Sequence, residues 1–336
     1  MKKIKNQSSV KLGVVMVHRG FNAHKMNGNR FDYVVGLDWL IKHSPVEISA
    51  VQVPLFPDHL REGKGLAKTK RLFKELRKRV RYVVPVLMLT TNPLDPKNKS
   101  EAIETLRNGL VQSGELGSEV CAATSFEAWL DGTINGLKPL KGKKLRKAID
   151  LLVDIHVSAI HAAYQERCGV QRLDMEYLRP GEFITFTNMR IALRVIGEIN
   201  RKLQCGFICR LLDDTAHAKD SGLSMKDQNK VRGICSCSDN HHIGTCHASE
   251  PTTRGALGSG GSAVVQGIRS MYRHGNPRTL MVEIFDCEGE ETAPMRQYIK
   301  GYGKKTYRDI NVAVVEGLIL VQNTLNQLAG ERNLLD

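Results

Sequence analysis

ICRLLDDTAHAKDSG, at residues 208–222, joins a mostly apolar run to a cluster of polar side chains. Residues 207–212 have the composition of a buried strand. Asp213, Asp214 and His217 follow directly, and side chains at the carboxyl end of one strand can point into one pocket. In barrels of parallel strands, active sites are built at that end. The segment therefore predicts that other strands of the chain end in matching ligands.

The composition is that of a globular protein. The chain has 336 residues, of which 41% are hydrophobic, enough for one large barrel or two ordinary domains. No apolar run reaches the ~20 residues of a membrane span, and the start MKKIKNQSSVKLG lacks the apolar core of a signal peptide. We therefore expect a cytoplasmic protein whose eight cysteines are reduced. Five of the cysteines lie within residues 205–246, but their spacing is not that of a zinc ribbon. We interpret them as small buried residues near strand ends, and their role stays open.

The net charge of +14 could indicate a nucleic-acid partner or an anionic substrate. The densest basic segments are residues 68–81 and 138–147, where apolar residues recur at helical spacing between the lysines and arginines. This pattern favours the solvated face of a helix over a binding patch.

Eight short apolar strands alternate with helices along the chain. The strands are predicted at residues 10–17, 46–55, 82–89, 119–124, 170–178, 206–212, 242–248 and 279–285. The helices are predicted at residues 31–43, 66–80, 100–113, 145–168, 187–203, 224–232, 262–272 and 307–328. This alternation predicts an α/β protein, a single (β/α)8 TIM barrel over residues 1–336, with helix 307–328 closing it. A doubly wound sheet is the competitor, but HRGFNAHKMNG after the first strand is not G-x-G-x-x-G.

The last four predicted strands each end in ionisable side chains. These are Glu176 and Glu182, then Asp214 and His217, then His247, Glu250 and Arg254, and finally Glu283. Carboxylates with one imidazole suit manganese, magnesium, cobalt or iron(II) better than structural zinc. We expect Asp214 to be the ligand and Asp213 to cap the following helix or to support the ligand. His156, on the apolar face of its helix, is interpreted as a core histidine.

This pattern resembles the xylose isomerase-like superfamily of TIM barrels, and most closely the ketose 3-epimerases of the D-tagatose and D-psicose 3-epimerase type. Those enzymes carry Glu-x5-Glu, Asp-x-x-His, a histidine followed by an arginine, and a glutamate on four successive strands. The resemblance covers residues 170–290. It implies that Glu176, Asp214, His247 and Glu283 bind one divalent metal ion, with Mn²⁺ first and Mg²⁺, Co²⁺ or Fe²⁺ as alternatives. It also implies catalytic roles for Glu176 and Glu283, and substrate-binding roles for Glu182, His217 and Arg254.

The resemblance implies a sugar isomerase or epimerase that abstracts a proton next to a carbonyl through a cis-enediolate. Residues 256–258 are Ala-Leu-Gly where these epimerases have Pro-Gly, so the substrate stays open. One alternative is a lyase of the C-glycoside deglycosidase kind, which cleaves 3-oxo-glycosides by β-elimination and uses a small second subunit. A second is an endonuclease IV-like DNA-repair nuclease, and a third is a non-catalytic binding subunit. We expect a small carbohydrate as partner, with no membrane and no nucleic acid. A homo-oligomer or a second subunit stays open.

Overall fold

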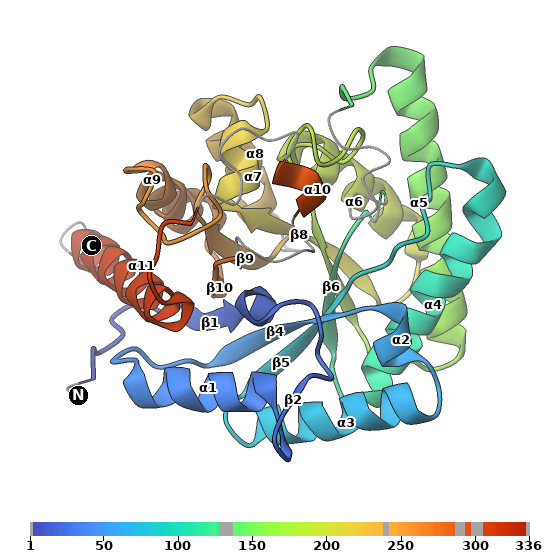
Figure 1. Cartoon of the computed structure of the whole chain (residues 1–336). Helices are drawn as coiled ribbons and strands as arrows, with labels where there is room; N and C mark the ends of the chain where they lie inside the picture. Colours follow the sequence, from blue (N-terminus) through green and yellow to red (C-terminus); the bar gives the residue numbers. More distant parts are fainter. Residues whose placement is uncertain are drawn as a thin grey trace.

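The computed structural model describes residues 3–125, 127, 137–237, 242–285, 293–296 and 305–333. A closed barrel of parallel strands in the order β1-β10-β9-β8-β7-β6-β5-β4 lies at its centre, with helices around it (Figure 1). The (β/α)8 TIM barrel predicted from the sequence is thereby confirmed. The barrel strands are β1 Lys11–Val15, β4 Ala50–Leu55, β5 Tyr82–Leu87, β6 Val120–Thr124, β7 Arg172–Glu176, β8 Ile208–Asp214, β9 Ile243–Ser249 and β10 Thr279–Glu283.

The outer layer consists of the eight predicted helices, with their ends shifted by a few residues. They are α1 Asp32–His43, α3 Lys64–Arg77, α4 Lys99–Glu115, α5 Gly142–Gln165, α6 Met189–Leu203, α8 Met225–Cys237, α9 Ala263–Ser270 and α11 Ile310–Asn333. Several short elements were not predicted from the sequence, because each has too few residues to show the repeat of apolar side chains that marks a helix or a strand. They include the hairpin β2 Met26–Asn27 with β3 Arg30–Phe31, and the helices α2 Pro57–Leu60, α7 Thr215–Asp220 and α10 Ala293–Arg296.

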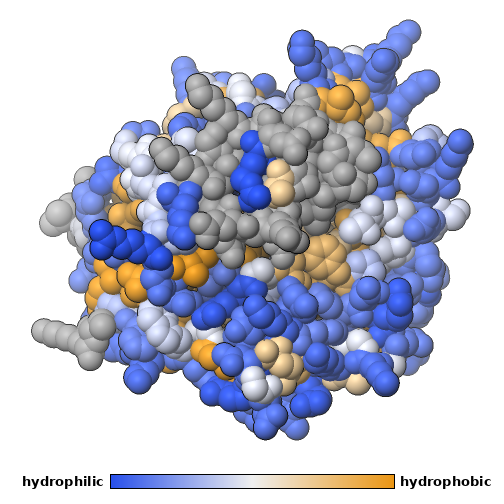
Figure 2. Space-filling model, in the orientation of Figure 1, coloured by the Kyte–Doolittle hydropathy of each residue, from blue (hydrophilic) through white to orange (hydrophobic). Residues whose placement is uncertain are grey.

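The basic segment that forms α3 is an amphipathic surface helix, as predicted. Leu66, Leu72, Phe73 and Leu76 are buried against the barrel, whereas its lysines lie on the outer side or only partly covered. Figure 2 shows the corresponding lower edge of the molecule as mostly hydrophilic, with apolar surface in separate small patches. The charge of this segment is therefore carried by a solvated face.

Two strands differ from their predicted bounds in a way that matters for the site. The first strand ends at Val15, and Met16–Arg19 form a 3-10 turn instead of continuing it. β8 is shifted by two residues from its predicted bounds, so it ends at Asp214 and not at residue 212. The ligand candidate Asp214 therefore belongs to the strand itself, so its position is set by the barrel.

The described residues also bear on the expectations for the cysteines and for His156. The cysteines with described side chains are free thiols: Cys121, Cys168, Cys205, Cys209, Cys235 and Cys246. His156 is buried in α5, and its Nδ1 lies 2.7 Å from the Leu152 carbonyl oxygen, as expected of a core histidine. In the described part of the chain, no helix combines the length and the apolar character needed to cross a bilayer.

Candidate metal centre

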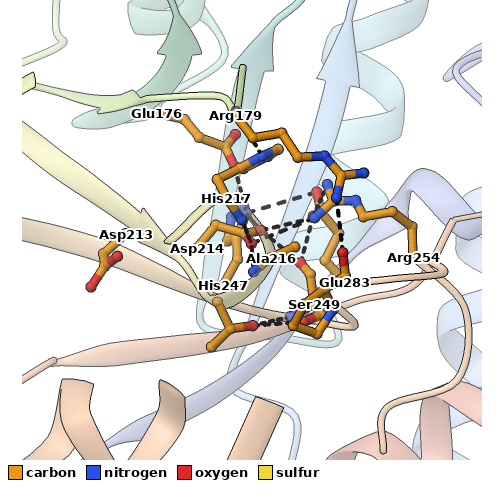
Figure 3. A network of polar contacts seen from close by, with 12 residues as sticks. Glu176, Arg179, Asp213, Asp214, Ala216, His217, His247, Ser249, Arg254 and Glu283 are labelled. Carbon is orange, nitrogen blue, oxygen red and sulfur yellow. Dashed lines mark hydrogen bonds and ion pairs between the residues drawn. The ribbon is translucent and has the colours of Figure 1, made fainter. Parts of the chain in front are cut away.

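The four predicted metal ligands lie together at the carboxyl ends of neighbouring strands (Figure 3). Glu176, Asp214 and Glu283 are the last residues of β7, β8 and β10, and His247 lies two residues before the end of β9. Because side chains alternate across a strand, these positions face the barrel interior. One ligand atom of each residue lies within 4.8 Å of the others, and all four residues are buried.

The imidazole of His247 lies among the three carboxylates. Its Nδ1 is 3.4 Å from Glu176 Oε1, 3.7 Å from Asp214 Oδ2 and 3.7 Å from Glu283 Oε1. Its other nitrogen, Nε2, lies 2.6 Å from the side-chain oxygen of Gln52 on β4. The ring is therefore held at one nitrogen and presents the other to the acidic cluster.

The donor set fits a divalent cation. Glu176 Oε1 and His247 Nδ1 are buried 3.4 Å apart, and neither makes a hydrogen bond of ordinary geometry. Both atoms face the same point, where a positive ion would satisfy them. Carboxylate oxygens with one imidazole nitrogen are ligands that suit manganese, magnesium, cobalt or iron(II). The residues present could thus hold one metal ion.

Asp214, and not Asp213, caps the helix that follows β8, which corrects one expectation. Its Oδ1 accepts hydrogen bonds from the backbone N–H groups of Ala216 and His217, so Asp214 itself caps α7. Asp213 lies on the other side of β8, outside the barrel, where it accepts hydrogen bonds from Tyr177 Oη at 2.9 Å and Arg232 Nε at 2.7 Å. The prediction that Asp213 caps the helix was wrong, because strand alternation points it away from the helix start.

Ser249 connects two of the carboxyl groups. Its Oγ lies 2.6 Å from Asp214 Oδ2 and 2.8 Å from Glu283 Oε2. A hydroxyl has one hydrogen, so it donates to one of these groups and accepts from the other. Burial raises the pKa of Glu283 to about 7, whereas Arg254, against the effect of burial, holds the pKa of Asp214 well below its usual range. Glu283 is therefore the carboxyl group that can be protonated and donate to Ser249 Oγ, while Ser249 donates its own hydrogen to Asp214.

The electrostatics of the cluster favour a cation at its centre. Burial alone would lower the pKa of His247. The negative charges of Glu176 and Glu283 outweigh this effect and raise the pKa of His247 to about 9. Burial also raises the pKa of Glu176. A proton on His247 Nδ1 and a metal ion would neutralise the same carboxylates, so the two compete for this nitrogen.

Arg254 also contacts this cluster, from the loop after β9. Its guanidinium donates to Glu283 Oε2 at 2.8 Å, lies 3.3 Å from Asp214 Oδ2 and covers the Phe285 ring at 4.6 Å from the centroid. Its backbone has φ of +60°, in the left-handed region that side chains other than glycine seldom adopt. Strain of this kind concentrates at binding and active sites, where the surrounding structure enforces it.

The predicted substrate-facing residues Glu182 and His217 line the same pocket as Arg254. His217 Nδ1 accepts the backbone N–H of Arg179 at 3.3 Å, and its Nε2 lies 3.5 Å from Glu176 Oε1. Burial lowers the pKa of His217 well below its usual range, so the ring is neutral. Because Nδ1 accepts, the ring hydrogen lies on Nε2, which faces the pocket.

Arg179 links three loops at the rim of the site. Its side chain is buried and donates to Glu182 Oε1 at 3.1 Å, to Asp220 Oδ2 at 2.6 Å and to the carbonyl oxygen of Pro251 at 2.8 Å. These residues follow β7, β8 and β9 respectively. The loop after β7 is fixed at a second point, because the buried Glu127 carboxylate accepts backbone N–H groups from residues 184–186 at 2.9–3.1 Å.

The pocket above the cluster has two unlike sides. One, here named the charged half, comes from β7 to β10 and the loops that follow them: Glu176, Glu182, His217, His247, Arg254 and Glu283. The other, named the apolar half, comes from β1, β4, β5 and the residues that follow them: Val15, Val17, Phe21, Pro54, Val86 and Met88. A ligand in this pocket would therefore contact polar groups on one side and hydrocarbon on the other.

Three residues of the site were not predicted from the sequence: Gln52, Arg179 and Ser249. Gln52 is the polar residue in the apolar run of its strand, and that contrast is the signal that could have found it. Ser249 follows His247 by two residues, which places both on one face of β9. Nothing in the sequence around Arg179 indicates its partners, because they come from other loops.

No protein-family model and no curated protein matches this chain. Solved structures do match it. A D-allulose 3-epimerase from Methylomonas sp. has a TM-score of 0.67 at 16% identity, over 96% of this chain and 99% of that one. A 3-keto-D-glucoside 4-epimerase from E. coli has a TM-score of 0.60 at 12% identity, over 94% and 99%. The IOLI protein with a binding zinc atom has a TM-score of 0.56 at 14% identity, over 96% and 99%. The chain thus shares the (β/α)8 barrel fold of these structures, which is the fold that the resemblance implied.

Proposed function

We propose that this chain is a divalent-metal-dependent sugar isomerase or epimerase, which removes a proton next to a carbonyl and returns one through a cis-enediolate. The observation that supports it is the set of four ligand atoms within 4.8 Å of one another, two of them from glutamates with raised pKa. Solved structures of the same fold include a D-allulose 3-epimerase, and one was solved with zinc. We propose Mn²⁺ as the ion, with Mg²⁺, Co²⁺ and Fe²⁺ as alternatives.

Glu176 and Glu283 are the proposed acid–base pair. When bound, a divalent ion supplies positive charge to a hydroxyl and its neighbouring carbonyl, which acidifies the C–H bond between them. In the metal-free protein, burial raises the pKa of Glu283 to about 7, toward the range in which a carboxyl group can act as a general acid or base near neutral pH. One glutamate takes the proton from carbon and the other returns a proton to the enediolate. Ser249 holds the carboxyl group of Glu283 in place.

His217 and Arg254 are the proposed donors to the oxygen that becomes negative. The Nε2–H of His217 faces the pocket, and the guanidinium of Arg254 lies beside Glu283. Losing one such donor costs on the order of 2.7–4 kcal/mol of barrier. Glu182, held by Arg179, is the proposed acceptor for a substrate hydroxyl.

Hydrogen exchange at carbon tests the proposal directly. The Mn²⁺-loaded protein is incubated with D-fructose and, separately, D-psicose in deuterated water, and ¹H NMR follows the C–H signal at C3. We expect loss of that signal and appearance of the 3-epimer. If the loaded protein exchanges no carbon-bound hydrogen in any ketose or 3-oxo-glycoside, the proposed chemistry is wrong.

The apolar half of the pocket favours a second candidate, a lyase that acts on 3-oxo-glycosides. The terminal hydroxyls of a free ketose would lie against Val15, Pro54, Val86 and Met88 without partners, at about 1–3 kcal/mol for each buried group. An aromatic aglycone would bury its ring there instead. In this reaction the base removes the C–H next to the 3-oxo group, the bond to the aglycone breaks, and the aglycone leaves with a proton.

An aryl 3-oxo-glycoside separates the two candidates. Release of the free aglycone, followed by its absorbance, together with no hydrogen exchange in free ketoses, would select the lyase. Epimerisation of free ketoses without release of aglycone would select the epimerase. A small second subunit, which the lyase would need, would appear as a co-purifying chain.

The nuclease alternative has less support. Endonuclease IV-like enzymes bind three metal ions, so they need ligands beyond the four described above. Among the described residues, the cluster of Glu176, Asp214, His247 and Glu283 is the group of three or more side chains placed to hold an ion. The solvated face of α3 also gives the net charge an explanation that requires no nucleic acid.

A further inference from the structure

Gln52 is a polar side chain in a strand that is otherwise apolar. It is fully buried in β4, where the other residues are Ala50, Val51, Val53, Pro54 and Leu55. Its register neighbours on the adjoining strands are Val15 and Val84. A methionine would fill the same space without burying an amide. The packing therefore gives no reason for a glutamine.

The contact that Gln52 makes lies on the other side of the barrel interior. Its Oε1 lies 2.6 Å from Nε2 of His247 on β9, whereas β4 pairs with β1 and β5. Its amide nitrogen is buried without a hydrogen-bond partner. A buried amide that satisfies one side chain and leaves its own nitrogen unsatisfied destabilises the fold. Such a conflict between stability and local sequence is typical of functional positions.

We propose that Gln52 is a positioning residue for the metal centre, because its carbonyl oxygen keeps a hydrogen on His247 Nε2 and so commits Nδ1 to the metal ion. This inference rests on the proposed metal site. A neutral imidazole carries one hydrogen, and the nitrogen without it is the one that can bind a metal. Nδ1 is the nitrogen 3.4–3.7 Å from the three carboxylates. A hydrogen left on Nδ1 would point into the cluster and exclude the ion.

Three variants separate this role from a purely structural one. Gln52→Met keeps the volume and removes the acceptor, whereas Gln52→Glu keeps an acceptor at the same place. Gln322→Met is the matched control: Gln322 is a buried glutamine of α11 that donates to Asn6 at 3.0 Å and to Asn326 at 2.9 Å, outside the site. The measured quantity is the dissociation constant for Mn²⁺, from competition with a chelator at fixed pH.

We expect Gln52→Met to weaken Mn²⁺ binding 10- to 100-fold, the range observed when a hydrogen-bond partner of a metal-binding histidine is removed. Gln52→Glu should bind Mn²⁺ within a few-fold of the wild type, or more tightly. Gln322→Met should leave the constant unchanged. The melting temperature of metal-free Gln52→Met should stay close to that of the wild type, because the removal of an unsatisfied amide nitrogen is offset by the loss of the acceptor for His247 Nε2–H. Gln322→Met should melt lower, because it loses satisfied hydrogen bonds.

A spectroscopic readout reports the ring hydrogen itself. In the zinc-loaded wild type, long-range ¹H–¹⁵N spectra should show His247 protonated at Nε2 and metal-bound at Nδ1. In zinc-loaded Gln52→Met, we expect the Nε2–H of His247 to exchange with solvent faster.

Two results would overturn the inference about Gln52. One is unchanged Mn²⁺ affinity in Gln52→Met while the wild type binds the ion. The other is a lower melting temperature in both Gln52 variants, including failure of Gln52→Met to fold, which would assign the residue to packing. If the wild type itself does not bind Mn²⁺, Zn²⁺ or Co²⁺, the proposed metal site fails instead, so the two failures are distinguishable.

Discussion

The charged half and the apolar half of the pocket are built by the same repeated unit, yet they serve different ends. In both halves a parallel strand ends at the pocket and directs alternate side chains inward. β7 to β10 and the loops after them place all the ionisable groups of the lining there, together with Leu178 and Phe285, and β1, β4 and β5 place hydrocarbon. The barrel therefore fixes where side chains meet, and their chemical type decides what happens there.

This division indicates separate tasks for the two halves. In the proposed mechanism, the charged half would hold the ion and move the proton, so changes there should lower kcat. The apolar half would contact the part of the substrate that does not react, so changes there should raise KM. Gln52 links them, because it comes from β4 of the apolar side and contacts His247 of the charged side.

The largest effect is expected for Glu283→Gln in the charged half. This variant removes the proposed acid–base group and one proposed metal ligand while keeping the size of the side chain. We expect kcat to fall on the order of 10⁴-fold, with the far-UV circular dichroism and cooperative thermal unfolding retained. Glu198→Gln, at the exposed face of α6, is the control. Turnover close to the wild-type rate would remove Glu283 from the mechanism.

Arg254→Met should have the next largest effect. It removes the guanidinium that donates to Glu283 at 2.8 Å and lies 3.3 Å from Asp214. We expect kcat to fall on the order of 10²–10³-fold, as for the loss of one donor to a developing negative oxygen. Arg254→Lys keeps the charge and should lose less. An effect confined to KM would assign Arg254 to substrate binding alone.

The affinity for Mn²⁺ should depend on pH in a defined direction. The pKa of His247 is raised to about 9, so between pH 7 and 9 the ion must displace a proton from it. We expect the affinity to rise about tenfold per pH unit in this range. Below pH 7 the slope should steepen, because Glu283, with a pKa of about 7, is then protonated as well. An affinity independent of pH from 7 to 9 would contradict the assignment of His247 as a ligand.

The same shifts predict how the metal-free protein responds to pH. A histidine with a raised pKa stabilises the fold fully below its unfolded value of 6.5, and this contribution is lost as the pH rises through 9. The raised pKa of Glu283 acts in the same direction, with its contribution lost from about pH 4.5 to about pH 7. Metal-free protein should therefore gain less from these groups at pH 9 than at pH 6, and Mn²⁺ should raise the melting temperature more at pH 9.

Val86→Thr in the apolar half should have the smallest effect. The variant keeps the shape of the side chain and adds a hydroxyl to the hydrocarbon wall. We expect KM to rise about fivefold for a substrate with an apolar group there, equivalent to ~1 kcal/mol, with kcat unchanged. Val312→Thr, at an exposed position of α11, is the control. A lower KM in Val86→Thr would show that the substrate presents hydroxyls to this side.

The sequence predicted most of the fold because the barrel repeats one simple pattern. Short apolar runs between amphipathic helices located all eight barrel strands, and the spacing of ionisable residues at strand ends located the four residues that cluster. The exact strand ends were harder. The sequence pattern places Asp214 beyond its strand, because an aspartate normally ends a strand pattern, but Asp214 pairs in register with His247.

What the sequence did not predict depends on contacts between distant strands. Gln52 and His247 are 195 residues apart, and no local period relates them. Ser249 gains its role from Glu283 on the next strand of the barrel, and Arg179 from loops that follow three strands. Asp213 and Asp214 are neighbours in sequence, but strand alternation sends one inside the barrel and the other outside. Local patterns therefore find the candidate ligands, and the three-dimensional structure is needed to find the residues that contact them.

The buried side chain of Arg179 has a kinetic consequence. It joins the loops after β7, β8 and β9 through Glu182, Asp220 and the carbonyl of Pro251, so none of these loops can lift without breaking a shared set of hydrogen bonds. They should open together, as one cooperative event, and not one after another. Substitution of Arg179 should therefore shorten the residence time of a ligand bound beneath them, whereas the loop after β7 would keep its second anchor at Glu127.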